Sequence, residues 1–213
     1  FGRELCGAAW AKSKASKIDM FKGSSGAISQ TAGRAMFRCK APLKRAVVAC
    51  LQASPKGDCA NGPHGPIALW DVSAVTTMDK LFNDARSFNG DISKWDVSHV
   101  IFMSAMFADA TSFNGGLLEW DVSSVVDTSG AFRGAAAFNG DLSRWDVSSV
   151  TTMARMFHSA TSFNGDISKW NVSSVATISS MFNSATSFNN DVSKWDVSKV
   201  TKMNRMFWQA TSF

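Results

Sequence analysis

The chain has 213 residues, of which 45% are apolar and 18% are charged, a composition typical of folded proteins and not of disordered ones. No apolar run approaches the about 18 residues that a membrane-spanning helix needs, so no membrane span is predicted. The net charge of +5 is unevenly distributed. Residues 1–50 carry ten Lys and Arg against two acidic residues, whereas residues 51–213 are mildly acidic.

Residues 1–41 are predicted to be a basic N-terminal arm, because their aromatic and apolar side chains follow neither a helical nor a strand period. Such a segment buries too little apolar surface to offset the entropy cost of ordering it, so we expect a partner to order it. No nucleic-acid-binding module is recognisable in it, which leaves an acidic protein surface or an anionic lipid as the expected partner. The expected partner contacts of the arm are Trp10, Lys12, Lys14, Lys17 and Phe21.

The four cysteines, Cys6, Cys39, Cys50 and Cys59, all precede the repeats described next. Cysteines gathered in the part of the chain that is poorest in core residues favour two disulfides and a non-cytosolic compartment, either an organelle lumen or the cell exterior. Buried free thiols are the alternative interpretation. Zinc is not expected, because no C-x-x-C pair is present.

From Trp70 to Phe213 the sequence repeats every 25 residues without an insertion, which is the signature of a stacked-repeat architecture. Within one copy, residues 92–97 are rich in β-formers and predict a short strand. Apolar residues at helical spacing from Val100 to Ala110 predict a short helix, with Ser98 as its N-cap. Because one such unit cannot bury its own apolar face, the sequence predicts an α/β repeat fold. We expect a right-handed solenoid with one short parallel strand and one short helix in each 25-residue coil.

Tryptophan, valine, methionine and phenylalanine columns are predicted to form the continuous core of this solenoid. The tryptophan column, whose members are expected to point inward, consists of Trp70, Trp95, Trp120, Trp145, Trp170 and Trp195. Phe213 falls inside a repeat, and no polar cap follows it. The solenoid is therefore expected to be C-terminally incomplete or to be covered by a partner at that end.

The motif FNGDISKWDVSSVTTMxxMF resembles the repeat of the BspA-like leucine-rich-repeat surface proteins, over the whole of residues 70–213. Residues 43–73, LKRAVVACLQASPKGDCANGPHGPIALWDVS, resemble the helical N-terminal cap of algal members, dinoflagellate ones especially. The resemblance implies a leucine-rich-repeat-like solenoid that is usually secreted or exposed at a cell surface and serves adhesion or protein binding. It brings no catalytic residues, and it implies a helical cap over residues 42–69.

Cys50 and Cys59 flank the end of this cap helix and a Pro-Lys-Gly turn, and we predict that they are bonded. A bridge between Cys6 and Cys39 would close the arm into a loop and lower the cost of ordering it.

The third copy departs from the pattern. It has Gly116-Leu117-Leu118-Glu119 where other copies have Asp-Ile-Ser-Lys, and it places Gly130 and Gly134 in the predicted helix, which they would weaken. Drift in one tolerant repeat explains these changes, since single exposed apolar residues are ordinary. The functional alternative is a partner-contact patch centred on Leu118.

Aspartates also recur in columns, one directly after each tryptophan with Asn171 interrupting it, and a second four residues before the tryptophan. Calcium between the coils is one interpretation of stacked carboxylates. The other is that each carboxylate accepts turn N–H groups of its own coil, which the absence of the glycine-rich calcium nonapeptide favours.

No catalytic, cofactor-binding or metal site is predicted, and the sequence is not expected to encode an enzyme. His64, His99 and His158 occupy unrelated places in the repeat, so no nucleophile and base share a deviation from it. Two functions are open. The first is an accessory structural subunit of a larger assembly, such as an algal organellar or photosynthetic complex, docked by its arm. The second is a secreted or cell-surface adhesion module.

Overall fold

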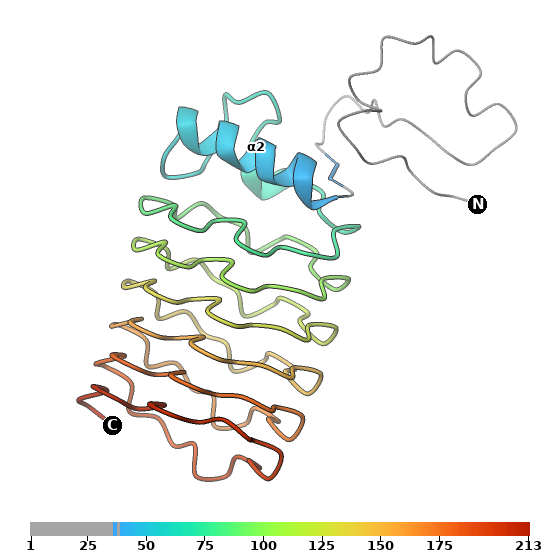
Figure 1. The fold of residues 1–213 in the computed structure, drawn as a ribbon. Helices are drawn as coiled ribbons and strands as arrows, with labels where there is room; N and C mark the ends of the chain where they lie inside the picture. Colours follow the sequence, from blue (N-terminus) through green and yellow to red (C-terminus); the bar gives the residue numbers. More distant parts are fainter. Residues whose placement is uncertain (1–35, 38) are drawn as a thin grey trace, which may run out of the picture.

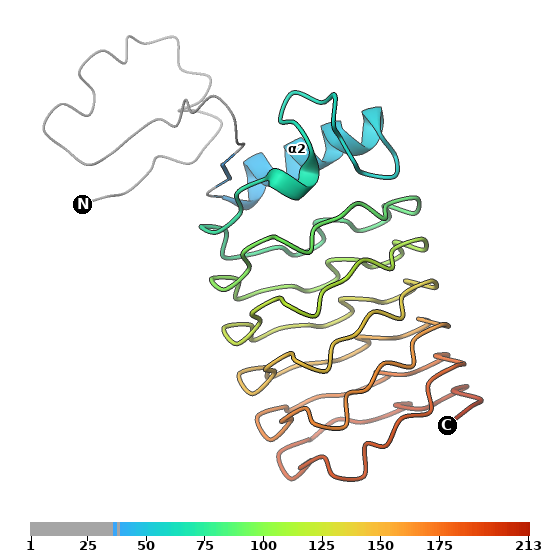
Figure 2. The same ribbon diagram turned by 180° about the vertical axis from the view of Figure 1, so that it is seen from behind.

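The computed structural model describes residues 36, 37 and 39–213, and shows an N-terminal helix lying across one end of a stack of coils (Figures 1 and 2). The helices of the described residues are α2 (Lys40–Ala53) and the short 3-10 helix η1 (Ile67–Leu69). The C-terminus lies at the end of the stack opposite α2. The expected arm contacts Trp10, Lys12, Lys14, Lys17 and Phe21 lie outside the described residues, as does the pairing suggested for Cys6.

Helix α2 packs on the first coil through buried residues at helical spacing: Leu43, Ala46, Val47 and Cys50. Pro42 fits the first turn of α2, where no intrahelical N–H bond is lost, and the helix ends before Pro55, which disfavours helical backbone at Ser54. Cys50 and Cys59, the pair that the sequence predicted to be bonded, form a disulfide with a Cα–Cα distance of 5.3 Å. It ties the last turn of α2 to the loop that follows.

The boundary predicted for the arm at residue 41 is too late. Helix α2 already begins at Lys40, and Met36 forms a parallel β-bridge with Asp71. Phe37 is buried against Trp70, with 5.0 Å between the ring centroids. The end of the predicted arm therefore packs on the first coil, because Phe37 extends the aromatic column of the core by one ring.

Each coil pairs with the next through a parallel β-bridge every 25 residues. The bridged residues are Thr77, Phe102, Asp127, Thr152, Thr177 and Lys202. Hydrogen bonds beside the bridges repeat at the same period, as when Ile101 N donates to Thr76 O at 2.8 Å and Thr151 N to Val126 O at 2.9 Å. The coil-to-coil pairing thus lies in the segment after the Trp-Asp-Val triplet. Residues 92–97, predicted as a strand, instead form a turn closed by Trp95 N and Ile92 O at 3.0 Å.

The helix predicted from Val100 to Ala110 is not formed. Its backbone runs through successive turns, in which Met106 N donates to Met103 O at 3.2 Å, with Ala105 in the left-handed region at φ 51°. Alternate N–H groups, such as that of Ala105, donate to the next coil at 2.8 Å and so are not available for a helix. Apolar residues three and four positions apart can face the core from such turns as well as from a helix. The predicted apolar columns are therefore present, although the predicted helix is not.

The same turns explain the two glycines of the third copy. Gly130 has φ 60° and Gly134 has φ 67°, and the equivalent residues of the other coils, Lys80 and Asp84 among them, are also left-handed. Glycine adopts this backbone without the strain that a Cβ imposes. The two glycines therefore suit the coil, and do not weaken it as the helix prediction implied.

The predicted core columns are buried except in the last coil, where Val197 is 40% exposed and Met203 is 47% exposed. Trp95, Trp145 and Trp170 are each at most 4% exposed, which confirms the inward position expected of the tryptophans. In the tryptophan column, each indole N–H from Trp95 to Trp195 donates to a backbone carbonyl 28 residues earlier, at 2.8–3.1 Å. Two phenylalanine columns stack beside them, with 5.5–6.1 Å between ring centroids of successive coils. In the last coil, Phe213 of the second column is 53% exposed.

Candidate functional site

One segment of each coil carries aspartate–serine turns. In the second coil it consists of residues 91–98, and we call this segment and its equivalents in the other coils the turn face. The aspartate after each tryptophan, or Asn171 in its place, accepts the N–H of the serine two residues later at 3.0–3.2 Å. The second column does the same with its own serines: Asp91, Asp141, Asp166 and Asp191 accept at 2.9–3.0 Å. The carboxylates thus bind turn N–H groups of their own coil, as the second interpretation of these columns held. No group of three or more His, Cys, Asp or Glu side chains in the described part of the chain is placed to hold a metal ion.

A second segment, which we call the bridge face, consists of the bridged residue of each coil and the residue before it. Its members are Thr76, Thr77, Ile101, Phe102, Val126, Asp127, Thr151, Thr152, Ala176, Thr177, Thr201 and Lys202. Ile101 is 38% exposed and Phe102 is 44% exposed, so an apolar patch lies open on the second coil. The backbone repeats strictly along this face while its side chains change from coil to coil.

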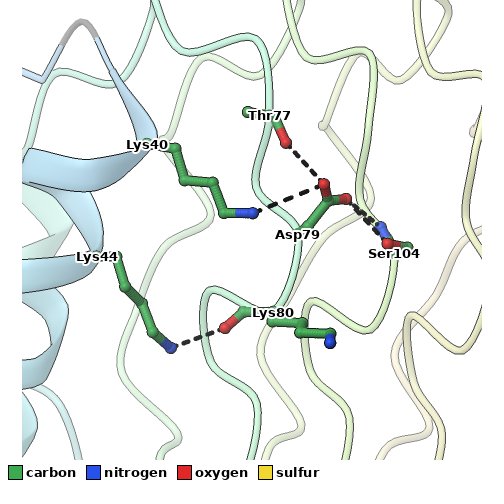
Figure 3. Close-up of polar contacts among 6 residues, drawn as sticks. All are labelled: Lys40, Lys44, Thr77, Asp79, Lys80 and Ser104. Atoms are coloured by element: carbon green, nitrogen blue, oxygen red, sulfur yellow. Dashed lines mark hydrogen bonds and ion pairs between the residues drawn. The ribbon is translucent and has the colours of Figure 1, made fainter. Parts of the chain in front are cut away.

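Helix α2 meets the first coil through two lysines (Figure 3). Lys44 Nζ donates to the carbonyls of Lys80 and Leu81 at 2.7 and 2.8 Å. In the next coil the carbonyl equivalent to that of Leu81, on Met106, accepts an N–H from the coil before it. No coil precedes the first one to donate to the Leu81 carbonyl, and Lys44 supplies that donor instead. Partial burial, followed by repulsion from Lys40, lowers the pKa of Lys44, while Asp84 opposes the shift.

Lys40 makes a looser contact, 3.6 Å from an Asp79 oxygen (Figure 3). Asp79 also accepts hydrogen bonds from the Thr77 hydroxyl at 2.9 Å and from the N–H and hydroxyl of Ser104 at 2.9 and 3.0 Å. Its carboxylate is satisfied by the coils themselves, so Lys40 adds little to the junction.

Residues 58–154 and 131–213 match the family described as Mycoplasma protein of unknown function, DUF285. The chain belongs to this family. The two overlapping matches cover more than half of the chain and all of the repeats, in agreement with the resemblance to BspA-like repeats drawn from the sequence. The family description assigns no activity. No curated protein matches the sequence.

Of the residues predicted as partner contacts, the structure describes only Leu118, and Trp10, Lys12, Lys14, Lys17 and Phe21 lie outside the described residues. Leu118 is half-buried and lies on the turn face. Gly116 stands where the second aspartate column has its aspartate, so that turn is absent there while the turn of Asp121 and Ser123 is kept. Neighbouring Glu119 pairs with Arg144 at 2.6 Å. The bridge face was not predicted from the sequence. Its signal was that the residues at positions 76–77 and their equivalents change from coil to coil, whereas those at 71–73 and their equivalents are nearly constant.

Helix α2 is too short to cross a bilayer, and neither helix in the described ranges combines the length and hydropathy that a membrane span needs.

Replacing Lys44 with methionine is expected to lower the free energy of unfolding by about 1–2 kcal/mol, since the Leu81 carbonyl loses its donor and the Lys80 carbonyl keeps only the N–H of Asn83 at 3.4 Å. Lys40→Met is the matched control and should cost at most about 0.5 kcal/mol, because an exposed ion pair contributes little. Urea denaturation of both variants checks this. A larger loss for Lys40→Met would show that the junction depends on the ion pair.

The turn face is expected to lose stability in acid. Hydrogen bonds from the serine hydroxyl, then from the serine N–H, lower the pKa of Asp121, Asp146 and Asp196 below the ordinary value of 3.8. Because the folded pKa is the lower one, this stabilisation is complete above pH 3.8 and is lost as the pH falls through the folded values. Asn171 shows that an amide oxygen accepts the same bonds. The triple Asp→Asn variant should therefore fold at pH 7 and show a shallower decline in melting temperature below pH 4, and an unchanged decline would contradict this account.

Proposed function

We propose that the protein is a non-catalytic, protein-binding scaffold that recognises its partner through the bridge face. In this proposal its coils form a right-handed, leucine-rich-repeat-like solenoid, and it serves as an accessory structural subunit of a larger assembly. The observation that carries the proposal is the contrast between the two faces. All six coils have serine two residues after the turn-face aspartate or asparagine, whereas the bridged position holds Thr, Phe, Asp or Lys.

Such a contrast suits recognition of one particular partner. Stacked coils hold each bridge-face residue at a fixed spacing from its neighbours, so the side chains form a preorganised surface. Ile101 and Phe102 supply an exposed apolar patch there, and buried aromatic anchors carry much of the energy of protein interfaces. Asp127 lies beside Phe102 across the bridge and adds a charged group to the same patch.

The assembly we propose lies in a non-cytosolic compartment, an organelle lumen or the cell exterior. The Cys50–Cys59 disulfide supports an oxidising environment. The resemblance to algal members of the BspA-like repeats supports an algal organellar or photosynthetic complex, to which residues 1–35 would contribute docking contacts. The same resemblance supports the second candidate, a secreted or cell-surface adhesion module.

Two variants that borrow residues from other coils test the bridge face. Ile101→Thr together with Phe102→Thr copies Thr151 and Thr152, and Lys94→Glu on the turn face copies Glu119, so both should fold. The bridge-face variant is expected to co-purify with the native assembly at a yield at least about tenfold lower, the loss expected of one interface anchor. The turn-face variant should co-purify normally. Normal recovery of the bridge-face variant would disprove this face as the docking surface.

A further inference from the structure

A groove of about 420 Å³ lies between α2 and the first coil. Val48 and Leu51 of α2 form one wall, and Phe82 and Ala85 of the first coil form the other. Val48 is 43% exposed, so apolar surface is open to solvent at the mouth of the groove. Lys44 and Arg86 add positive charge at its rim, against Asp84 alone.

The other coils show which hydrogen bonds the backbone on the coil side of this groove can make to an adjacent coil. Where the second coil meets the first, Asp84 N donates to Ala108 O at 2.8 Å, and Ser112 N donates to Arg86 O at 3.0 Å. A three-residue segment of one coil thus gives an N–H to the next coil and accepts one back. The middle residue of that segment is alanine in every coil, and Ala110, Ala135, Ala160 and Ala185 are fully buried.

This pairing recurs between the coils that follow, at 2.6–3.2 Å. Backbone N–H groups donate to backbone carbonyls in three further coil interfaces. The pairs are Asp109 to Arg133 with Ala137 to Thr111 in the first, Gly134 to His158 with Ser162 to Ala136 in the second, and Ser159 to Asn183 with Ser187 to Thr161 in the third. It is therefore a fixed feature of the coil interface.

In the first coil the equivalent groups are the carbonyl of Asn83 and the N–H of Ser87, and both residues line the groove. Among residues 36, 37 and 39–213, no donor reaches that carbonyl and no acceptor reaches that N–H. Helix α2 covers the apolar core of the first coil but offers no backbone groups to this edge, because its own N–H and C=O groups are paired within the helix.

We propose that the groove binds an extended peptide segment of a partner protein, which takes the place of the missing preceding coil. The segment donates an N–H to the Asn83 carbonyl, accepts the N–H of Ser87, and places a small apolar side chain between Ala85 and Val48. Its backbone hydrogen bonds give affinity, and the apolar pocket gives selectivity, as in other cases of strand addition. An acidic residue next to the apolar one suits the positive rim, as in the segment Asp109-Ala110-Thr111 of the chain itself. The site is distinct from the bridge face and does not depend on the function proposed for that face.

The test uses a capped peptide of residues 106–113, MFADATSF, titrated into the isotopically labelled full chain and followed by NMR. Saturable shifts are expected at the amides of residues 83–87 and at the methyl groups of Val48 and Leu51. A matched peptide with an ester in place of the amide at Asp109 lacks the N–H donor and should bind up to about tenfold more weakly, as expected for one hydrogen bond. In the protein, Val48→Glu should weaken binding of the acidic peptide, and Ala176→Lys on the bridge face should leave it unchanged.

Several results would overturn the proposal. Absence of saturable shifts, shifts confined to the last coil around Met203 and Gln209, or equal binding of the amide and ester peptides would each do so. Without peptide, shifts of residues 1–35 on introducing Val48→Glu would assign the groove to the chain's own N-terminal segment. Groove shifts that depend on protein concentration would assign it to a second copy. Either assignment would replace the partner peptide as occupant.

Discussion

Replacing Phe138 with alanine is expected to lower the free energy of unfolding by about 3–5 kcal/mol, as for other buried phenylalanines. Phe138 is completely buried, and its ring centroid lies 5.9 Å from that of Phe113, 6.0 Å from that of Phe163 and 4.1 Å from that of Phe132. Alanine would leave a cavity in the middle of the stack that neighbouring coils cannot close without breaking their own pairing. Urea denaturation of the full chain, followed by tryptophan fluorescence, measures the loss.

Phe213→Ala is the matched control for this prediction, since Phe213 occupies the same column in the last coil and is 53% exposed. Its replacement should cost only about 1 kcal/mol, because much of its ring already contacts water. Equal losses at the two positions would mean that stacking along the column does not hold the coils together.

Replacing Trp145 with alanine is also expected to lower the free energy of unfolding by about 3–5 kcal/mol. Trp145 is 4% exposed, and its Nε1 donates to the Leu117 carbonyl of the preceding coil at 2.8 Å. Trp145→Phe separates the two contributions. It keeps most of the apolar volume but removes the indole donor from the Leu117 carbonyl, which keeps only the N–H of Trp120 at 3.1 Å, and it should cost about 1 kcal/mol.

Trp208→Phe serves as the control for Trp145, because Trp208 lies outside the tryptophan column and is 54% exposed. It should leave the unfolding midpoint unchanged. If Trp145→Phe also left the midpoint unchanged, the indole hydrogen bond would contribute nothing to the joining of coils.

The core of this fold was accessible from the sequence, whereas the local backbone was not. A strict 25-residue period requires each apolar column to face the same column in the next coil, so the burial of Trp145 and Phe138 follows from spacing alone. The spacing of Val100, Met103 and Phe107 fits a helix and a series of turns equally well. Left-handed residues such as Ala105 carry no sequence signal, and Gly130 and Gly134 were the visible marks of that conformation.

The candidate sites were predicted less well, for a related reason. The hydrogen bonds of the aspartate columns are local, between residues two apart, and their logic could be argued from turn chemistry. The bridge face and the groove depend on which segment of the coil pairs with its neighbour, and the predicted strand at residues 92–97 placed that pairing in the wrong segment. Lys44 acquires its role only when α2 is docked, so no motif marked it.

The most direct test of the binding face is site-specific photo-crosslinking of the full-length protein in an extract of its native source. A photoreactive amino acid replaces Ala176 on the bridge face or Lys169 on the turn face, both of which are exposed. A discrete crosslinked partner is expected from Ala176 and should be lost in the Ile101→Thr, Phe102→Thr background, whereas none is expected from Lys169. A discrete partner captured from Lys169 and not from Ala176 would contradict this expectation.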